Sequence, residues 1–377
     1  MSNKHYISHV VDEWLCWVCY HKNQHQNSTC AMCRYEFGAC AVATEPFSAK
    51  LSWFHQLLHA WSRDHATGYS LVSVHRDEAV DSSMKQLLAI PPSSMRQRLK
   101  VEFHNEPGVD AGGGVLREWF GLVSRCLFSQ WFQPTHTPDV AYWFKAGTSR
   151  VVAKAIQEGQ CLSVHLAIPL WKHVLGMPMT WHDLVHVDAD LHQSIAWMLT
   201  HDNPPEALAL DFTMHGVPLM AGGADVAVTD ANKVEYVDKL VGYLLFEAVR
   251  TSLEAFLQGF YDVLSPPVLH AFDAFEMDLV LCGHDDINAT DWHVHTTVEY
   301  LKATPASSLP ILRRAKRDHH QHQQDVIDWF WRIVHSFSQV QKAKLLQFVT
   351  GSSRPPIEGF RVCYVVITIL PLNAPFV

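Results

Sequence analysis

Hydrophobic residues recur every three or four positions in the segment that follows residue 47. This spacing predicts one amphipathic helix from about Ser48 to Arg63, because residues spaced in this way fall on one face of a helix. We expect the helix to dock onto the domain that follows it, although a helix that binds a partner protein would show the same pattern. Its apolar positions are Trp53, Phe54, Leu57, Leu58 and Trp61.

From Leu71 onward, segments with helical spacing alternate with short strand-like segments. A strand begins at Arg98, and the glycines at 112–114 then form a turn before a helix predicted over Val115–Phe128. A glycine-rich turn ahead of a helix can cradle a phosphate group. This turn does not have the pattern of a nucleotide-binding loop, so we interpret it as a tight packing turn. The apolar face of the helix is predicted to contain Leu116, Trp119, Phe120 and Val123.

The composition is typical of a globular protein with a sizeable core. Hydrophobic residues make up 48% of the 377 residues and charged residues 18%, which allows two or three domains. The net charge of −9 argues against a general role in coating nucleic acid. We expect neither a secretory signal nor a membrane span. The N-terminus has no apolar stretch, and the longest apolar run, Val362–Leu372, is interrupted by Pro371.

Four of the nine cysteines lie within the first 33 residues. They form two Cys-x-x-Cys pairs, and four thiolates in this arrangement satisfy the tetrahedral coordination of Zn²⁺. We therefore predict one structural zinc ion, whose binding would supply folding energy to a short segment. A metal site of this kind indicates a reducing compartment, so we expect a cytoplasmic protein, with the nucleus as the alternative. The predicted ligands are Cys16, Cys19, Cys30 and Cys33.

The residues around these cysteines define a predicted finger over 10–36. Trp14 stands two residues before the first cysteine and Asn23 stands four after the second, a pattern that resembles the Ran-binding-protein type of zinc finger. Members of that family bind either ubiquitin or single-stranded RNA. The ubiquitin-binding members carry Thr-Phe where this chain has Tyr20-His21. The arginines and the aromatic residue that would bind RNA are too few to establish RNA recognition, so the ligand of the finger stays open.

Several segments between residues 71 and 360 share a further resemblance. VEFHNEPGVDAGGGVLREWF is similar to the opening signature of the HECT domain of ubiquitin ligases, with one extra glycine at 112–114. AKAIQEGQCLSVHLAIPLWKHVLGMPMTWHDLVHVDADLHQSI and VTDANKVEYVDKLVGYLL resemble the N-lobe of that family. DWFWRIVHSFSQVQKAKLLQFVTGSSRPPIEGF resembles the first half of its C-lobe. On these ordered motifs the chain is identified as a member of the HECT-type ubiquitin ligase family.

The resemblance implies an α+β fold with two lobes. A mostly helical N-lobe would cover 71–283 and a truncated α/β C-lobe 284–377, after a linker helix within 37–70. An insertion at about 302–324 stands where the family has a much shorter loop. Its basic run and its histidines favour a solvated loop over a metal site, because no cysteine or carboxylate cluster completes a set of ligands.

HECT ligases dock a ubiquitin-conjugating enzyme on the N-lobe, accept ubiquitin on a cysteine of the C-lobe and pass it to a substrate lysine. By motif position, a docking groove would contain one aromatic and four aliphatic residues, and the alternative is that each is a core residue. Tyr236 would begin a helix capped near Thr229-Asp230. A hinge between the lobes would lie at Gly283, His284 and Asp285, since glycine suits a joint that changes its dihedral angles. The groove residues are Leu191, Ile195, Leu208, Leu210 and Tyr236.

The catalytic cysteine of the family is expected to be missing from this chain. In the family it lies beyond the segment matched by PPIEGF, which ends here at Phe360, and it stands in a His-Thr-Cys-Phe-Asn context that this sequence does not contain. Cys363 stands instead in an apolar, β-branched run, which favours a buried and inert thiol in an aggregation-prone strand. We therefore predict no catalytic residue in this chain and a C-lobe truncated after residue 360.

Three functions are compatible with these patterns. The first is a HECT-type ubiquitin-protein ligase that forms a cysteine thioester with ubiquitin, with this step impaired or absent in the present chain. The second is a non-catalytic module that binds a conjugating enzyme. The third is a zinc-finger RNA-binding protein in which the HECT part is a scaffold. The expected partners are a conjugating enzyme, ubiquitin, unknown protein substrates and RNA through the finger, with no membrane.

Overall fold

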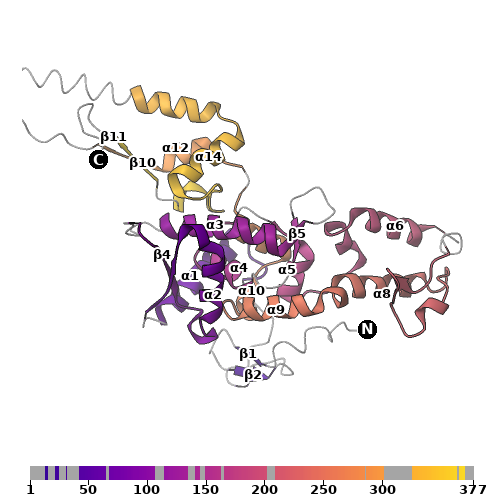
Figure 1. The fold of residues 1–377 in the computed structure, drawn as a ribbon. Helices are drawn as coiled ribbons and strands as arrows, with labels where there is room; N and C mark the ends of the chain where they lie inside the picture. The colour runs from indigo at the N-terminus through magenta and orange to yellow at the C-terminus, as the bar shows by residue number, and fades with distance from the viewer. Residues whose placement is uncertain are drawn as a thin grey trace, which may run out of the picture.

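The computed structural model of the chain describes most of the residues from 42 to 362 and short segments outside that range. The described residues are 13–15, 22–24, 31, 42–64, 68–106, 114–134, 141–144, 149–162, 165–201, 209–284, 286–300, 325–362 and 365–369. Within them the fold is mostly helical with short strands, in agreement with the expected α+β class (Figure 1).

Helices dominate the chain from residue 47 onward. The α-helices are α1 (Phe47–Asp64), α2 (Ala79–Ala89), α3 (Gly114–Trp131), α4 (Ser149–Gln157), α5 (Ile168–Leu175), α6 (Ala189–Thr200), α8 (Lys233–Leu245), α9 (Arg250–Tyr261), α10 (Pro266–Leu269), α11 (Ala274–Cys282), α12 (Ala289–His295) and α14 (Gln339–Thr350). A further helix covers residues 325–336.

The strands are short and pair in small, separate sheets. They are β1 (Glu13–Leu15), β2 (Lys22–Gln24), β3 (Tyr69–Val74), β4 (Arg98–Phe103), β5 (Phe132–Pro134), β6 (Ala141–Phe144), β7 (His165–Leu166), β8 (Thr213–Met214), β9 (Val217–Pro218), β10 (Thr296–Tyr300) and β11 (Val365–Ile369). Three of the pairs are antiparallel: β1 with β2, β5 with β6, and β8 with β9. The parallel pairs are β3 with β4, β6 with β7, and β10 with β11.

The large core is formed by α1 to α5 and α9 to α11, together with β3 and β4. The predicted amphipathic helix is confirmed as α1, and its buried side chains Leu51, Phe54 and Leu58 are spaced by three and four residues. Two of these, Phe54 and Leu58, join the same buried cluster as the residues that follow position 71, so α1 is an integral part of the large core. The helix therefore docks onto the domain that follows it, as expected.

The segment from β3 to α3 follows the predicted alternation of strand and helix. Strands β3 and β4 are parallel, and α2 supplies the crossover connection that a parallel pair needs. The predicted strand at Arg98 is confirmed as β4, which buries every second side chain. The predicted helix at Val115–Phe128 is confirmed as α3. Its predicted apolar face is buried and consists of Leu116, Trp119, Phe120 and Val123.

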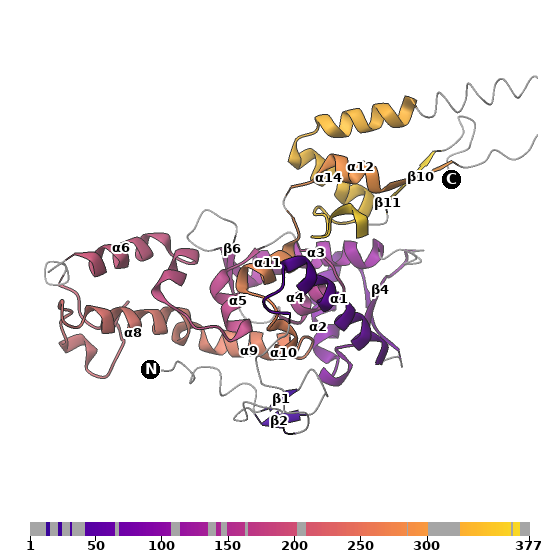
Figure 2. The same cartoon turned by 180° about the vertical axis from the view of Figure 1, so that it is seen from behind.

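A second core belongs to the small helical unit, which we define as residues 179–245. Helices α6 and α8 lie side by side in it and extend away from the large core (Figures 1 and 2). The apolar residues between them form a cluster that is separate from the large core. Its buried members are Leu184, Ile195, Met198, Phe212, Val228, Tyr236, Val237, Leu240, Val241 and Leu245.

A third core belongs to the C-terminal unit, which we define as the described residues of 286–369. It packs α12 against the helix at 325–336 and α14, and its centre is aromatic. The rings of Trp292 and Phe360 are stacked with 5.0 Å between their centroids, and Trp331 meets Trp292 edge-on. Within the apolar run after Phe360, the described residues Val365–Ile369 form strand β11, as the β-branched residues predicted, and pair with β10.

Near the N-terminus, the backbone of β1 and β2 forms a short antiparallel pair in which Trp14 stands opposite Asn23. The four cysteines predicted to bind zinc lie outside the described residues, as do Cys363 and the insertion at 302–324. Among the described residues, no helix is both long enough and apolar enough to cross a membrane.

Candidate functional site

The small helical unit holds most of the residues predicted to form a docking groove. Leu191 and Ile195 lie one turn apart on α6, and Asp188 caps this helix by accepting a hydrogen bond from the backbone N–H of Leu191 at 2.9 Å. Leu191 is half-buried, whereas Ile195 is only 2% exposed. Leu210 is half-buried and packs against the core of the unit. Leu208 lies outside the described residues.

Tyr236 belongs to the core of this unit. Its side chain is 6% exposed, and its ring meets Phe212 edge-on with 5.5 Å between the centroids. Burial, with the Asp211 carboxylate as a second cause, raises the pKa of its hydroxyl group. An open groove is therefore not found at Tyr236 or Ile195. The packing of α6 with α8 uses both as core residues, which is the alternative that the sequence left open.

The start of α8 differs from the prediction. The helix begins at Lys233, and the side chain of its N-cap residue, Asn232, makes no capping hydrogen bond to the helix. Asn232 turns back instead, and its side-chain oxygen accepts a hydrogen bond from the N–H of Thr229 at 2.7 Å. Asp230 forms an ion pair with Lys233 at 3.0 Å. The predicted cap at Thr229-Asp230 is wrong because these residues form a turn that precedes the helix.

An exposed apolar surface lies where α6 ends and α8 begins. Trp197 is 46% exposed and stacks on the ring of His201 with 4.9 Å between the centroids. The Lys233 ammonium donates to the carbonyl oxygen of His201 at 2.8 Å, which holds the two helix ends together. The next residue, Val234, is 61% exposed. We name Trp197 and Val234 the exposed apolar pair of the small helical unit. Sequence reasoning missed it, because the spacing of apolar residues does not tell which of them stay uncovered.

The predicted hinge lies between the large core and the C-terminal unit. Gly283 follows the last residue of α11 with φ of 71° and ψ of −162°, a conformation that is almost restricted to glycine. His284 is exposed, and Asp285 lies outside the described residues. The backbone conformation at Gly283 is one that glycine adopts readily, as expected for a joint. Movement about this joint stays a prediction.

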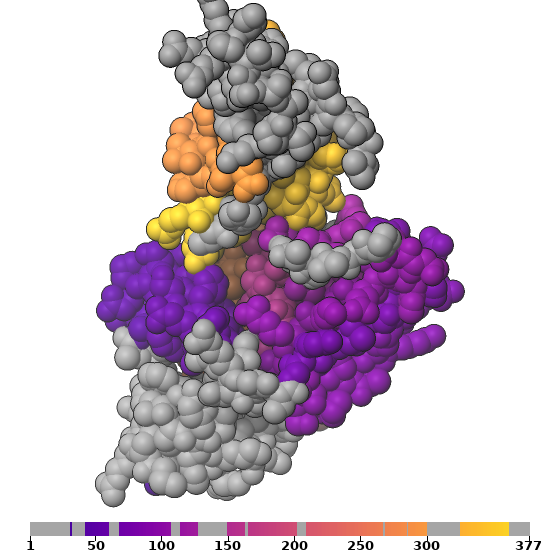
Figure 3. Space-filling view, turned by 90° about the vertical axis from the view of Figure 1, so that its left-hand side faces the viewer, coloured from indigo at the N-terminus to yellow at the C-terminus, as the bar shows by residue number. Residues whose placement is uncertain are grey.

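The C-terminal unit rests on the large core through residues 350–358. The guanidinium group of Arg117 on α3 donates to the carbonyl oxygen of Thr350 at 3.4 Å. Nδ1 of His55 on α1 lies 3.0 Å from the Glu358 carboxylate. Figure 3 shows the yellow surface of this unit directly above the indigo and magenta surfaces of the large core. A cavity of about 410 Å³ lies at this contact, lined by residues from both sides.

Beside this contact, the carboxylate of Asp278 on α11 collects hydrogen bonds from several elements. One oxygen accepts from the backbone N–H of Leu166 and from the indole N–H of Trp171, both at 3.0 Å. The other oxygen lies 2.6 Å from Nδ1 of His165. Nε2 of His165 lies 3.1 Å from the guanidinium group of Arg354, which belongs to the C-terminal unit. A chain of three side chains therefore links the large core to the C-terminal unit.

The same cluster is the candidate for a metal site among the described residues. Ligand-type atoms of His165, Asp278 and Cys282 lie within 4.8 Å of one another. The residues do not fit a cation, however, because the oxygens of Asp278 are already occupied by hydrogen-bond donors. The positive charge of Arg354 also faces the outer nitrogen of His165. We therefore interpret the cluster as a hydrogen-bond network.

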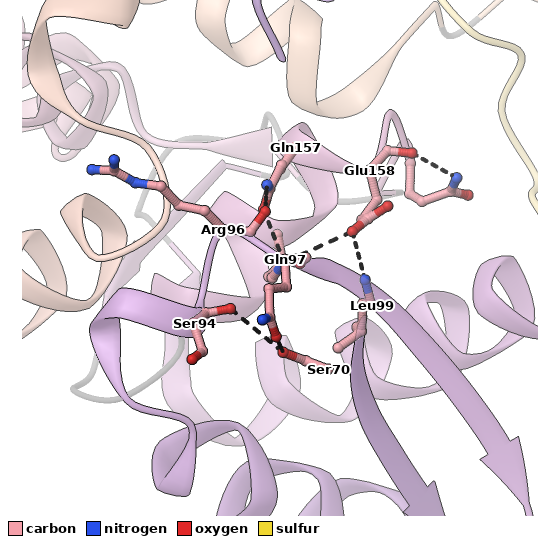
Figure 4. A network of polar contacts seen from close by, with 9 residues as sticks. Ser70, Ser94, Arg96, Gln97, Leu99, Gln157 and Glu158 are labelled. Atoms are coloured by element: carbon pink, nitrogen blue, oxygen red, sulfur yellow. Dashed lines mark hydrogen bonds and ion pairs between the residues drawn. The ribbon is translucent and has the colours of Figure 1, made fainter. Parts of the chain in front are cut away.

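A second buried network holds the turn after α4, which lines the cavity (Figure 4). The Glu158 carboxylate accepts a hydrogen bond from the N–H of Leu99 at 2.9 Å, and the Gln157 side chain donates to the carbonyl oxygen of Arg96 at 2.7 Å. Lys154 is fully buried and donates to Gln157 and to the carbonyl oxygen of Gln97. Burial lowers the pKa of Lys154 to about 8, although nearby Glu158 opposes this effect.

Comparison with known proteins gives one family. The model of the HECT-domain (ubiquitin-transferase) family matches residues 124–374. E3 ubiquitin-protein ligase UPL1 from Arabidopsis thaliana is 32% identical over 347 residues, which cover 84% of this chain and 9% of the relative. E3 ubiquitin-protein ligase HACE1 from Homo sapiens is 30% identical over 349 residues, which cover 85% of this chain and 36% of the relative. The chain thus spans about a third or less of the length of these relatives.

Proposed function

The chain belongs to the HECT family of ubiquitin transferases, and on this premise we propose that it acts as a HECT-type ubiquitin-protein ligase. Such a ligase accepts ubiquitin from a conjugating enzyme as a cysteine thioester and passes it to substrate lysines. The observation that carries the proposal is the family match over residues 124–374, which includes both the small helical unit and the C-terminal unit.

We assign the units of the structure to the two lobes of the family. The large core and the small helical unit would form the N-lobe, and the C-terminal unit would form the first half of the C-lobe. This assignment is supported by three separate buried clusters and by the single glycine joint after α11. On this assignment the boundary between the lobes would lie at Gly283, the position expected from the sequence.

The small helical unit would dock the conjugating enzyme. An aromatic side chain that is partly free of its own core is a typical anchor of a protein interface, because its burial on binding contributes most of the affinity. Trp197 has this character, and Val234 is a second exposed apolar residue, in the first turn of α8. Leu191 and Leu210 remain candidates because both are half-buried. The buried Ile195 and Tyr236 would support these residues from beneath.

Ubiquitin transfer requires a reactive thiolate. The thiolate attacks the carbonyl carbon of the thioester that joins ubiquitin to the conjugating enzyme, a new carbon–sulfur bond forms, and the thiolate of the conjugating enzyme leaves. We assign this role to no cysteine of the described residues. Cys282 is fully buried beneath the Asp278 carboxylate. Cys363 lies in an apolar run that disfavours the thiolate form.

A thioester assay separates this proposal from the alternative of a non-catalytic docking module. The chain is mixed with a conjugating enzyme that carries ubiquitin, and the products are resolved with and without a reducing agent. A reducible ubiquitin adduct on this chain supports the ligase, whereas binding without an adduct supports the docking module. Binding to no conjugating enzyme contradicts both. Cys363→Ser should leave the result unchanged, and loss of an adduct in this variant would make Cys363 the acceptor.

We also propose that Cys16, Cys19, Cys30 and Cys33 hold one structural zinc ion. The proposal is supported by the donor set, since four thiolates complete a tetrahedral site. It is also supported by the backbone pairing of β1 with β2, which brings the residues that flank the first cysteine pair close together. Metal analysis of the purified chain should find one zinc per chain and none after Cys16→Ser with Cys19→Ser. A metal-free wild-type chain would contradict the site.

The ligand of this finger is a separate question. Members of this zinc-finger family bind either ubiquitin or RNA, and the sequence around the cysteines favours neither ligand. Capture of the chain by immobilised single-stranded RNA, lost in the Cys16→Ser variant, would support a role in RNA binding. Equal capture of both chains would assign the RNA affinity to another surface.

A further inference from the structure

The hydrogen bond between His165 and Arg354 can form in only one direction. A guanidinium group has hydrogen-bond donors but no acceptor, so at 3.1 Å the Nε2 atom of His165 must accept from Arg354. The hydrogen of the neutral imidazole therefore lies on Nδ1, where it is donated to Asp278 over 2.6 Å. Only the form of His165 that has an unprotonated Nε2 can accept this hydrogen bond from Arg354.

The orientation of His165 is set from the large core. Asp278 cannot turn away from it freely, because its other oxygen accepts hydrogen bonds from Leu166 and Trp171. Both donors lie in the large core, and Trp171 is fully buried. The carboxylate therefore fixes the direction in which the imidazole ring faces the C-terminal unit. Carboxylates orient histidines in the same way at many metal and catalytic sites.

We propose that His165 is a positioning residue that helps to hold the C-terminal unit against the large core when its ring is neutral and loses the hydrogen bond from Arg354 when the ring is protonated. Protonation places a second N–H on Nε2, so two donors and two positive charges would face each other. The proposal deepens the proposed function and rests on it, because the orientation of the C-terminal unit controls where transferred ubiquitin would be delivered.

The two side chains that contact the His165 ring through hydrogen bonds act in opposite directions on its charge. The Asp278 carboxylate on α11 favours the protonated ring, and the Arg354 guanidinium of the C-terminal unit disfavours it. The Cys282 thiol, also on α11, is hydrogen-bonded to Asp278. Histidine is the residue type that changes charge within about pH 5 to 8, so the experiment compares the two ends of this range.

A nearby contact depends on pH in the opposite direction, so the experiment uses chains in which that pH dependence is removed. His55 pairs with Glu358 across the same contact, and protonation of His55 would strengthen that pair. Glu358→Gln keeps a hydrogen-bond acceptor for His55 but removes the negative charge. All chains in the experiment therefore carry Glu358→Gln.

The experiment measures the distance between two spin labels by pulsed electron paramagnetic resonance in the full chain. The labels are attached through non-natural amino acids at the exposed positions Leu88 and Phe348, which leaves the cysteines untouched. At about pH 8 we expect one narrow distance distribution, and at about pH 5.5 we expect part of it to move to longer and broader distances.

Three variants give the comparison. His165→Gln offers an acceptor that does not titrate, so its distribution should be narrow at both pH values. Arg354→Ala should be broad at both, and Lys344→Ala, which removes an exposed cation elsewhere on the C-terminal unit, should behave as the parent chain. A parent distribution that does not change with pH, or a narrow distribution in Arg354→Ala, would overturn the proposal. No ubiquitin is present, so failure here is distinct from failure of the thioester assay.

Discussion

A β-carbon on Gly283 would lie 2.5 Å from the carbonyl oxygen of Pro355. The backbone at the end of α11 therefore meets the C-terminal unit with no room for a side chain. The same added atom would lie 3.0 Å from the sulfur of Cys161. Glycine at this position is thus required twice, for its backbone conformation and for this close approach.

Gly283→Ala should weaken the contact between the C-terminal unit and the large core. The positive φ costs an alanine about 1–3 kcal/mol, and the clash with Pro355 must be relieved by moving residues 350–358. Hydrogen exchange in 350–358 should become faster, and the free energy of unfolding should fall by at least this amount.

Gly242→Ala is the matched control for that variant. Gly242 lies inside α8, and an added β-carbon would meet no atom within 4 Å. Alanine favours a helix interior over glycine by about 0.5–1 kcal/mol, so this variant should be slightly more stable than the wild type. Equal losses in both variants would mean that Gly283 has no special role at the joint.

Acid should weaken the link between the small helical unit and the large core. His173 on α5 is buried and donates through Nε2 to the carbonyl oxygen of Leu245, the last residue of α8, at 2.7 Å. Burial lowers the pKa of His173 to about 4, although the hydrogen bond to Leu245 and the Asp183 carboxylate oppose this effect.

The sign follows from the two states of His173. The unfolded chain takes up a proton near pH 6.5 and the folded chain only near pH 4, so stability is fully present above about 6.5 and is lost as the pH falls to about 4. The loss attributable to His173 is on the order of 3 kcal/mol. Urea unfolding at about pH 7 and about pH 4.5 should show a smaller difference for His173→Gln than for the wild type. Burial also lowers the pKa of His270, so the effect of His173 is read from the difference between the wild type and His173→Gln.

Lys154→Met should destabilise the fold strongly. The ammonium group is buried beside Glu158 at 3.8 Å, and its removal leaves that carboxylate and the carbonyl oxygen of Gln97 without this donor. Breaking a buried pair in this way costs about 3–5 kcal/mol. Lys100→Met is the control, since Lys100 pairs with Glu102 at the surface, where such pairs contribute about 0–1 kcal/mol. Urea unfolding of both variants measures the contrast, and similar losses would show that burial of Lys154 is not the cause.

The elements that the sequence predicted well are those decided by local spacing. Apolar residues three and four apart identified α1 and α3, and alternation identified β4, because each pattern reflects one face turned to a core. The same patterns do not tell which neighbour covers that face. Ile195 and Tyr236 were therefore expected in a groove and are found in the core of the small helical unit.

The network at the joint had no signal in the sequence. His165 and Asp278 are 113 positions apart, and Arg354 is 189 positions from His165. Polar residues at such separations show no periodicity, so only the folded chain brings them together. The exposure of Trp197 was hidden for a related reason, since α6 carries apolar residues on more than one face and α8 covers only part of them.

We propose that the small helical unit docks a ubiquitin-conjugating enzyme. Titration calorimetry of the full chain against a complete panel of these enzymes tests this docking most directly. We expect at least one enzyme to bind, and Trp197→Ala to weaken that binding at least about tenfold, or about 1.4 kcal/mol. Phe348→Ala, which removes an exposed aromatic residue of the C-terminal unit, should leave the affinity unchanged. Binding by no enzyme of the panel, or full affinity in Trp197→Ala, would contradict docking by the small helical unit.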